Sequence, residues 1–289
     1  LFCAIDPDGV YYLDNVDVGG ILPSNSKDLF YLAGILNAPV CNFVWQRISK
    51  PFQNNYYAAN KQFIAPIPIP DASETQKTKV KEGAQHLQQL HTQKRDYIDR
   101  FEQRLYSSQT TEKKEKETWL WADIGTPTDW KKSNQAPGDL SKSELTRWAK
   151  DMVAKKCQMH FEELNARLYP DAAITVESNG DELRLKIDGD TAIEHFGEDH
   201  TAFIAAQWRH TVRRLGTMEN LSAEKLVREL LKLRHTDHQG LREQIVSLDK
   251  EIQDLEARIN KAENEMNALI YDLYGLTEEE VKIVEAETK

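Results

Sequence analysis

The chain has 289 residues, of which 40% are hydrophobic and 29% are charged, and its formal net charge is −10. This composition is typical of a folded, helix-leaning protein rather than a disordered or membrane one. No apolar run approaches the roughly 18–20 residues needed to span a bilayer, and no basic-then-apolar signal opens the chain, so we expect no membrane segment.

The three cysteines are Cys3, Cys41 and Cys157, and they form no Cys-x-x-Cys pair. This spacing argues against a disulfide framework or a zinc site and fits a reducing cytoplasm, so we expect buried thiols. The first residue is Leu1 rather than Met, and it opens inside an apolar run. We therefore expect the chain to be part of a longer protein.

The negative charge is unevenly distributed along the chain. Residues 1–70 contain four Lys or Arg and five Asp or Glu, and residues 71–118 contain ten and nine, so the acid excess lies after Thr118. The overall charge counts against simple DNA binding, because affinity for phosphate normally comes from Lys and Arg. The near-neutral first part could still contact DNA through a local patch.

Residues 2–21 are expected to be strand-rich, with a tight turn at Asp6-Pro7-Asp8-Gly9. Two helices follow from near Lys27. The first has the helical period, and Pro39 suits the first turn of the second. The apolar residues that show this period are Leu29, Leu32, Ala33 and Leu36.

The segment 49–60 is rich in side chains that can contact DNA. Asn and Gln can pair with adenine, Lys and Arg can bind guanine or phosphate, and aromatic rings can stack on an unpaired base. Asn is also a common turn residue, so an ordinary loop is the alternative interpretation. The predicted DNA-binding residues are Arg47, Lys50, Gln53, Asn54, Asn55, Tyr56, Tyr57, Asn60 and Lys61.

Residues 63–70 are expected to form an edge or terminal strand, because every second residue from Pro66 to Pro70 is a proline and cannot donate a hydrogen bond to a neighbouring strand. Residues 71–118 are expected to be a linker and a long helix. A 4-3 alternation from Val80 to Leu105 predicts a coiled-coil seam that includes His91, at a partly exposed position. The charged run 112–117 is expected to be solvated.

Residues 119–215 are expected to form a mixed α/β region, beginning with a tryptophan-containing loop over 119–140. A capping box at Ser141 and Glu144 starts a helix to about Leu168. Asn179-Gly180 predicts a hairpin over 173–187. A further helix over 201–215 carries a basic patch that we expect to be solvated, made of Arg209, His210, Arg213 and Arg214.

Residues 216–289 are expected to be helical. A helix capped by Ser222 runs through Leu233, and an unbroken 4-3 seam over 241–273 predicts a long coiled-coil helix. Within the chain its antiparallel partner would be the helix over 80–105, and self-association or subunit contact through 241–273 is also possible. Gly275 suits a C-terminal cap, and Thr277 with Glu280 forms a second capping box.

A metal nuclease is the weakest alternative. Pro170-Asp171, Glu182 and Lys186 faintly suggest a PD…(D/E)xK site, but Arg184 stands where the metal needs a carboxylate. The closest histidine pair, His235 and His238, is expected to be an exposed helix end, so we predict no metal site.

Motifs at the two ends of the chain point to one family. The first motif is a "LLGILNS" helix, which is matched by Leu32 and by Gly34 to Asn37, with Ala38 in place of the usual Ser. A "KxxxxxxPIP" segment follows it in the same order, and the matching residues are Lys61 to Phe63 and Pro66 to Pro70. Residues 270–285, IYDLYGLTEEEVKIVE, are similar to "VYxLYGLTxEEIxxVE". Both resemble the C-terminal TaqI-like specificity (target-recognition) domain of type II and IIG restriction-modification adenine-specific DNA methyltransferases.

This resemblance implies a DNA sequence-recognition and scaffold fragment that is not catalytic alone. The parent would methylate adenine N6 with S-adenosylmethionine, and its missing N-terminal methyltransferase domain and double-stranded DNA would be the partners. The chain has no NPPY or DPPY tetrapeptide and no Gly-rich cofactor loop, so we expect no cofactor in it. The alternative is a coiled-coil interaction module without direct DNA binding, and a basic patch around Arg47, Lys50 and Lys61 would discriminate the two.

The expected fold is therefore α+β and helix-rich, with a small mixed α/β recognition unit and long antiparallel coiled-coil-like helices. Its expected parts are residues 1–70 of the recognition unit, a linker and long helix at 71–118, the mixed region at 119–215 and the helical region at 216–289.

Overall fold

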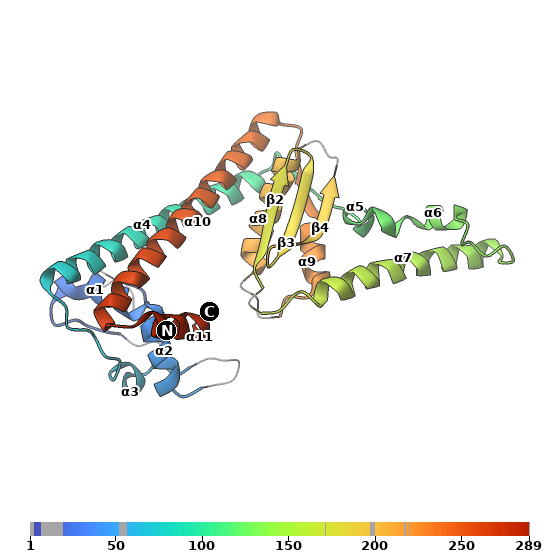
Figure 1. Ribbon diagram of the computed structural model, residues 1–289. Coiled ribbons are helices and arrows are strands. Elements are labelled where there is room, and N and C mark those ends of the chain that lie inside the picture. Colours follow the sequence, from blue (N-terminus) through green and yellow to red (C-terminus); the bar gives the residue numbers. More distant parts are fainter. Residues whose placement is uncertain are drawn as a thin grey trace. The chain divides into compact units, whose positions relative to one another are not determined.

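The computed structural model describes residues 3–6, 20–51, 57–170, 172–196, 200–216, 218 and 220–288. Helices dominate this part of the chain, and they are accompanied by a small antiparallel sheet, which confirms a helix-rich α+β fold (Figure 1). None of the described helices combines the length and the apolar character that crossing a membrane requires.

The chain divides into two compact units. Unit 1 comprises Leu1–Asp96 and Ile252–Lys289, and unit 2 comprises Tyr97–Glu251. Two long helices, α4 (Glu74–Leu105) and α10 (Gln239–Tyr274), each begin in one unit and end in the other. Unit 1 is therefore discontinuous in sequence, and unit 2 is continuous.

Unit 1 begins with the predicted helix pair. The 3-10 turn η1 (Ser26–Asp28) leads into α1 (Leu29–Leu36), and α2 (Pro39–Ile48) has Pro39 in its first turn, as expected. The short helix α3 (Lys61–Ile64) and the final helix α11 (Glu278–Glu287) complete the unit. Most of the predicted strand-rich segment 2–21 lies outside the described residues, and residues 3–6 form no strand.

The predicted strand over 63–70 is wrong. Its first residues belong to α3, and the proline segment that follows has no strand partner in the described part of the chain. The prolines of this segment lack a backbone N–H, so they can offer only carbonyl groups to their neighbours. Those carbonyls accept hydrogen bonds from tyrosine side chains instead.

In unit 1, α4 and α10 pack antiparallel, as predicted. Lys94 pairs with Glu256 at 3.2 Å, and His91 pairs with Glu263 at 3.5 Å, so the numbering rises on one helix as it falls on the other. His91 is half exposed, as expected, but Leu90, which the predicted seam left out, is fully buried. A leucine one position away is the less costly side chain to bury, because a buried imidazole must find polar partners.

Unit 2 contains an antiparallel sheet of three strands in the order β2 (Ile174–Asn179), β3 (Glu182–Ile187) and β4 (Asp190–Phe196). The predicted hairpin is confirmed, with Gly180 in the left-handed conformation at its turn. The third strand was not predicted. Its turn, Asp188-Gly189, has positive φ at both residues, which is a hairpin signal of the same kind.

The core of unit 2 forms where this sheet meets α8 (Thr201–Leu215) and α9 (Ala223–Leu230). Trp208 is fully buried there with Leu183 and Leu185 from the sheet, and its indole N–H donates to Leu230 O at 3.1 Å. The helix predicted to run through Leu233 ends at Leu230, and Leu233 instead lies in the strand β5 (Lys232–His235).

The charged run after α4 also contains a strand. The predicted long helix ends at Leu105, and β1 (Thr111–Lys114) pairs antiparallel with β5. The tryptophan-containing segment forms three short elements, α5 (Glu117–Leu120), η3 (Ala122–Ile124) and α6 (Pro127–Lys132). Helix α7 (Lys142–Asn165) starts from the predicted capping box.

Candidate nucleic-acid interface

The segments that carry the family resemblance meet in one hydrophobic core of unit 1. Ile35 from α1, Ile67 from the proline segment, Ile270 and Tyr271 from α10, and Val284 from α11 are all buried in it. Sequence segments from opposite ends of the chain are therefore parts of one packed structure.

Gly34, the glycine of the motif in α1, lies where there is little space for a side chain. A Cβ atom at Gly34 would lie 2.5 Å from Met266 Cε and 3.0 Å from Val80 Cγ1. A larger residue would require the Met266 methyl group to move and Val80 to shift by a few tenths of an ångström, so glycine permits the close approach of α1 to α4 and α10.

The asparagine that ends the same motif holds the first described segment of the chain. Asn37 Oδ1 accepts from Cys3 N at 2.8 Å, while Asn37 Nδ2 donates to Cys3 O and to Ala33 O, each at 2.9 Å. One side-chain amide thus satisfies both backbone groups of Cys3, as a neighbouring strand would.

Two tyrosines hold the proline segment through its carbonyl groups. Tyr274 Oη donates to Pro68 O at 2.6 Å, and Tyr31 Oη donates to Pro70 O at 3.0 Å. Cys41 Sγ lies 3.2 Å from Tyr274 Oη. Burial raises the pKa of Cys41 to about 11 and also raises the pKa of Tyr274, so both groups stay protonated at neutral pH.

We expect Tyr274→Phe to destabilise the protein by about 1–2 kcal/mol, because the Pro68 carbonyl and the Cys41 thiol lose a shared partner. Urea unfolding followed by far-ultraviolet circular dichroism measures this change. Tyr106→Phe is the control, since Tyr106 is half exposed and its hydroxyl removal should change stability by less than about 0.5 kcal/mol. Equal stability of Tyr274→Phe and wild type would contradict the role given to Tyr274.

The predicted DNA-binding loop is held at its base. Ser49 Oγ and Trp45 Nε1 both donate to Ala58 O, at 2.6 and 3.1 Å, and Ala58 N donates to Lys50 O at 3.0 Å. Pro51 and Tyr57 form an antiparallel bridge, and the Tyr57 ring packs on Trp45 with centroids 5.5 Å apart. The two ends of the loop are thus fixed side by side on α2.

The predicted DNA-binding residues divide into three groups. Lys50, Asn60 and Lys61 are exposed beside the loop base, and Asn60 precedes α3 as its N-cap residue. Tyr57 is half-buried against Trp45. The remaining loop residues lie outside the described part of the chain: Gln53, Asn54, Asn55 and Tyr56.

Arg47 is engaged by its own protein. Its guanidinium group pairs with Glu287 of α11, lies 3.3 Å from the centroid of the Phe43 ring and donates to Phe43 O at 3.0 Å. Lys50 and Lys61 have no ion pair among the residues that the structure describes. The expected basic patch is therefore reduced to two lysines, with Arg47 partly neutralised.

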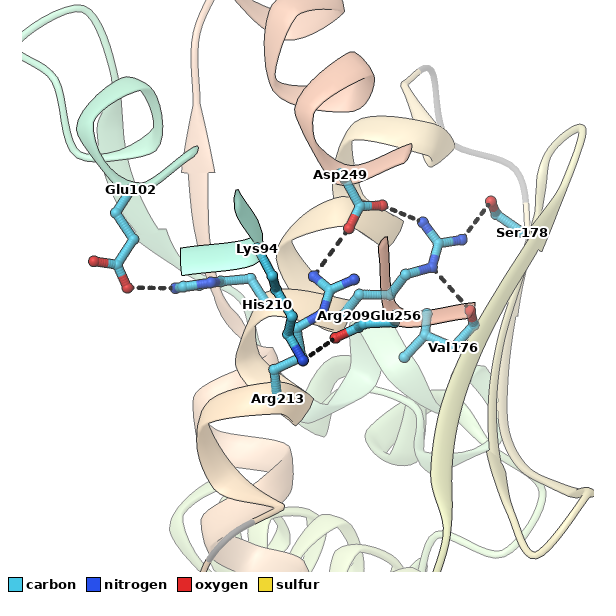
Figure 2. Close-up of polar contacts among 9 residues, drawn as sticks. All are labelled: Lys94, Glu102, Val176, Ser178, Arg209, His210, Arg213, Asp249 and Glu256. Atoms are coloured by element: carbon cyan, nitrogen blue, oxygen red, sulfur yellow. Dashed lines mark hydrogen bonds and ion pairs between the residues drawn. The ribbon is translucent and has the colours of Figure 1, made fainter. Parts of the chain in front are cut away.

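The basic patch predicted on α8 is not solvated, and Figure 2 shows its contacts. Asp249 of α10, which is 1% exposed, binds Arg209 Nη1 at 2.6 Å and Arg213 Nη1 at 3.1 Å. Arg209 also donates to Val176 O at 3.0 Å and to Ser178 Oγ at 3.3 Å. These arginines hold α8 to α10 and β2, and only Arg214 of the patch is exposed.

His210 is buried in the same region. Its ring packs on Phe101 with centroids 5.1 Å apart, and its Nε2 lies 3.4 Å from Glu102 Oε1 without hydrogen-bond geometry (Figure 2). Burial, together with the positive charges of Arg214 and Arg213, lowers the pKa of His210 to about 4. His210 is thus neutral at pH 7 and is a core residue.

The alternative nuclease site finds no support in the described residues. Lys186 pairs with Glu177 at 2.7 Å and Arg184 pairs with Glu194 at 2.6 Å, so both serve cross-strand pairing within the sheet. Asp171 lies outside the described residues, and among those described no group of three His, Cys, Asp or Glu side chains is placed to hold a metal ion.

No family model, curated protein or solved structure matched the chain in our comparisons. Function is therefore inferred from the residues and contacts of the chain itself.

Proposed function

We propose that this chain is the DNA sequence-recognition and scaffold part of a restriction-modification adenine methyltransferase. The observation that carries this proposal is the shared core of unit 1. The resembling segments pack together there, and the same unit holds the base of a polar, aromatic loop between Lys50 and Tyr57.

In this proposal, the loop reads base edges and unit 1 supplies its support. The exposed Lys50 and Lys61 bind phosphate or guanine, and the Asn and Gln side chains of the loop pair with bases. A recognition loop benefits from fixed ends, because a flexible loop loses more conformational entropy when it binds.

The chemistry would belong to the parent enzyme. Its methyltransferase domain would bind S-adenosylmethionine and transfer the methyl group to adenine N6, while this chain selects the DNA site. The paired helices α4 and α10 would act as a scaffold that fixes spacing or contacts another subunit.

A second candidate is a protein-interaction module without direct DNA contact. The pairing of Arg47 with Glu287 and the three consecutive glutamates that begin α11, Glu278 to Glu280, favour it, because both reduce the positive potential of unit 1.

Fluorescence anisotropy with mixed duplex DNA at low salt tests the proposal. We expect wild type to bind in a salt-dependent way, and Lys50/Asn60/Lys61→Ala to bind roughly 10-fold more weakly or worse, with a salt slope shallower by about 2. The control is Lys79/Asn260/Lys261→Ala, which removes the same residue types from exposed positions on the long helices of unit 1.

Equal binding by the loop variant and the control would contradict a DNA-facing surface at the loop. No binding by wild type even at low salt would contradict DNA affinity of the isolated chain and favour the interaction module.

A further inference from the structure

A second cationic surface lies in unit 2, on what we call the α6–α7 arm, residues 127–156. This segment contains seven Lys or Arg and four Asp or Glu, in a chain whose net charge is −10. Helix α6 lies alongside the N-terminal half of α7, at the end of α7 that points away from the sheet (Figure 1). Positive charge is thus concentrated on one projecting element.

Two of the four acids in the arm are used locally. Asp129 Oδ2 accepts from Thr126 Oγ1 at 2.6 Å and from Thr126 N at 2.8 Å, and Glu144 Oε2 accepts from Ser141 Oγ at 2.6 Å and from Ser141 N at 3.0 Å. These hydrogen bonds lower the pKa of both carboxyl groups. Each carboxylate is therefore committed to capping its own helix.

One cation of the arm, Lys156, lies 3.9 Å from Asp123, but most of the others are not used in this way. Lys132, Arg147, Lys150 and Lys155 are exposed, and none of them forms an ion pair within the described part of the chain. By contrast, the arginines that hold the core of unit 2 together, Arg209 and Arg213, are mostly buried against Asp249. The charges of these four side chains remain available to an external anion.

The arm presents these charges on a fixed support. Trp130 of α6 meets Trp148 of α7 edge to face at 6.1 Å, and its indole N–H donates to Ile124 O at 2.7 Å. Ala149 is fully buried in the same helix, and Leu164 anchors the far end of α7 in the core of unit 2. Cations on a packed helix lose less freedom on binding than cations on a loop.

We propose that the α6–α7 arm binds the phosphate backbone of duplex DNA without reading sequence. Arg147 and Lys155 are eight residues apart, so at a rise of 1.5 Å per residue they span about 12 Å of helix. That length matches about three or four phosphates of one DNA strand. The choice of DNA as the polyanion rests on the proposed function, but the cations involved are separate from those of the loop.

The test compares two charge-matched variants with wild type. The arm variant is Lys132/Arg147/Lys150/Lys155→Gln, and the control is Lys79/Arg258/Lys261/Lys282→Gln, which removes three lysines and one arginine from exposed positions of unit 1. In anisotropy titrations with a random-sequence duplex, we expect the arm variant to bind at least about 10-fold more weakly than the control, with a salt slope shallower by about 3.

Equal losses in the arm variant and the control would overturn the proposal, because they would reflect net charge alone. Absence of DNA binding by wild type would overturn the proposal as well. So would an arm variant that binds DNA like wild type but shows a changed oligomeric state in sedimentation, because the arm would then be a contact between copies of the chain. If the arm variant loses binding and the loop variant does not, the arm is supported and the loop assignment fails. The opposite result supports the loop alone.

Discussion

Replacing Asp249 with alanine is expected to lower the unfolding free energy by about 3–5 kcal/mol, the largest effect that we predict for a single substitution. Asp249 is the shared partner of Arg209 and Arg213, and all three side chains are mostly buried. Without the carboxylate, two positive charges remain close together in a poorly solvated region. The loss should exceed the value of a single hydrogen bond, because desolvation of the arginines is no longer compensated.

Tryptophan fluorescence during urea unfolding suits this measurement, because five of the six tryptophans lie in unit 2. The control is Glu251→Ala, on the same helix but exposed, which should change stability by less than about 0.5 kcal/mol. If Asp249→Ala also changes the unfolding free energy by less than about 0.5 kcal/mol, the ion cluster does not hold α8 to α10.

Acid is expected to destabilise the protein through His210, by about 3 kcal/mol between pH 7 and pH 4. The pKa of His210 is lowered from 6.5 to about 4 in the folded protein. The unfolded chain therefore takes up a proton as the pH falls below about 6.5, whereas the folded protein does so only near pH 4. Stability that is fully present above pH 6.5 is thus lost progressively as the pH falls towards 4.

The pH dependence of unfolding in wild type and in His210→Gln isolates this contribution. The substitution will also change stability at neutral pH, so the quantity to compare is the loss between pH 7 and pH 4 within each protein. We expect that loss to be smaller in His210→Gln by about 3 kcal/mol. Equal losses would show that His210 takes up its proton at the same pH in the folded and the unfolded protein.

Several elements could be predicted because their signals are local. The capping box at Ser141 starts α7, the Asn179-Gly180 turn forms the hairpin, and the long seam over 241–273 is one helix with its predicted partner. In each case the residues that determine the structure lie within a few positions of one another or repeat with one period.

Other features depend on partners far away in the sequence. The residues of β1, from Thr111 to Lys114, are all exposed and show no alternation, and their partner strand begins at Lys232. The arginines of α8 look like a solvated face until Asp249 is known to lie against them. Burial of a charge is predicted poorly from its own segment, because it depends on whether a counter-charge is present.

The candidate site shows the same limit. The sequence indicated the loop and its neighbouring lysines, and the structure places Lys50, Asn60 and Lys61 on the surface. It did not indicate that Arg47 would be held by Glu287, which is 240 residues away. That contact partly neutralises one of the three cations of the expected basic patch. Sequence patterns relate residues that are near one another in the chain, so they could not predict it.

The discontinuity of unit 1 has a consequence for the order in which the protein is made. Ile35 and Ile67 are synthesised before unit 2, but Ile270 and Val284, which share their core, are synthesised only after it. Unit 2 is continuous in sequence and can complete its core first. Unit 1 therefore cannot complete its core until the whole of unit 2 has been synthesised, and until then its apolar surfaces depend on chaperones or on the growing chain for protection.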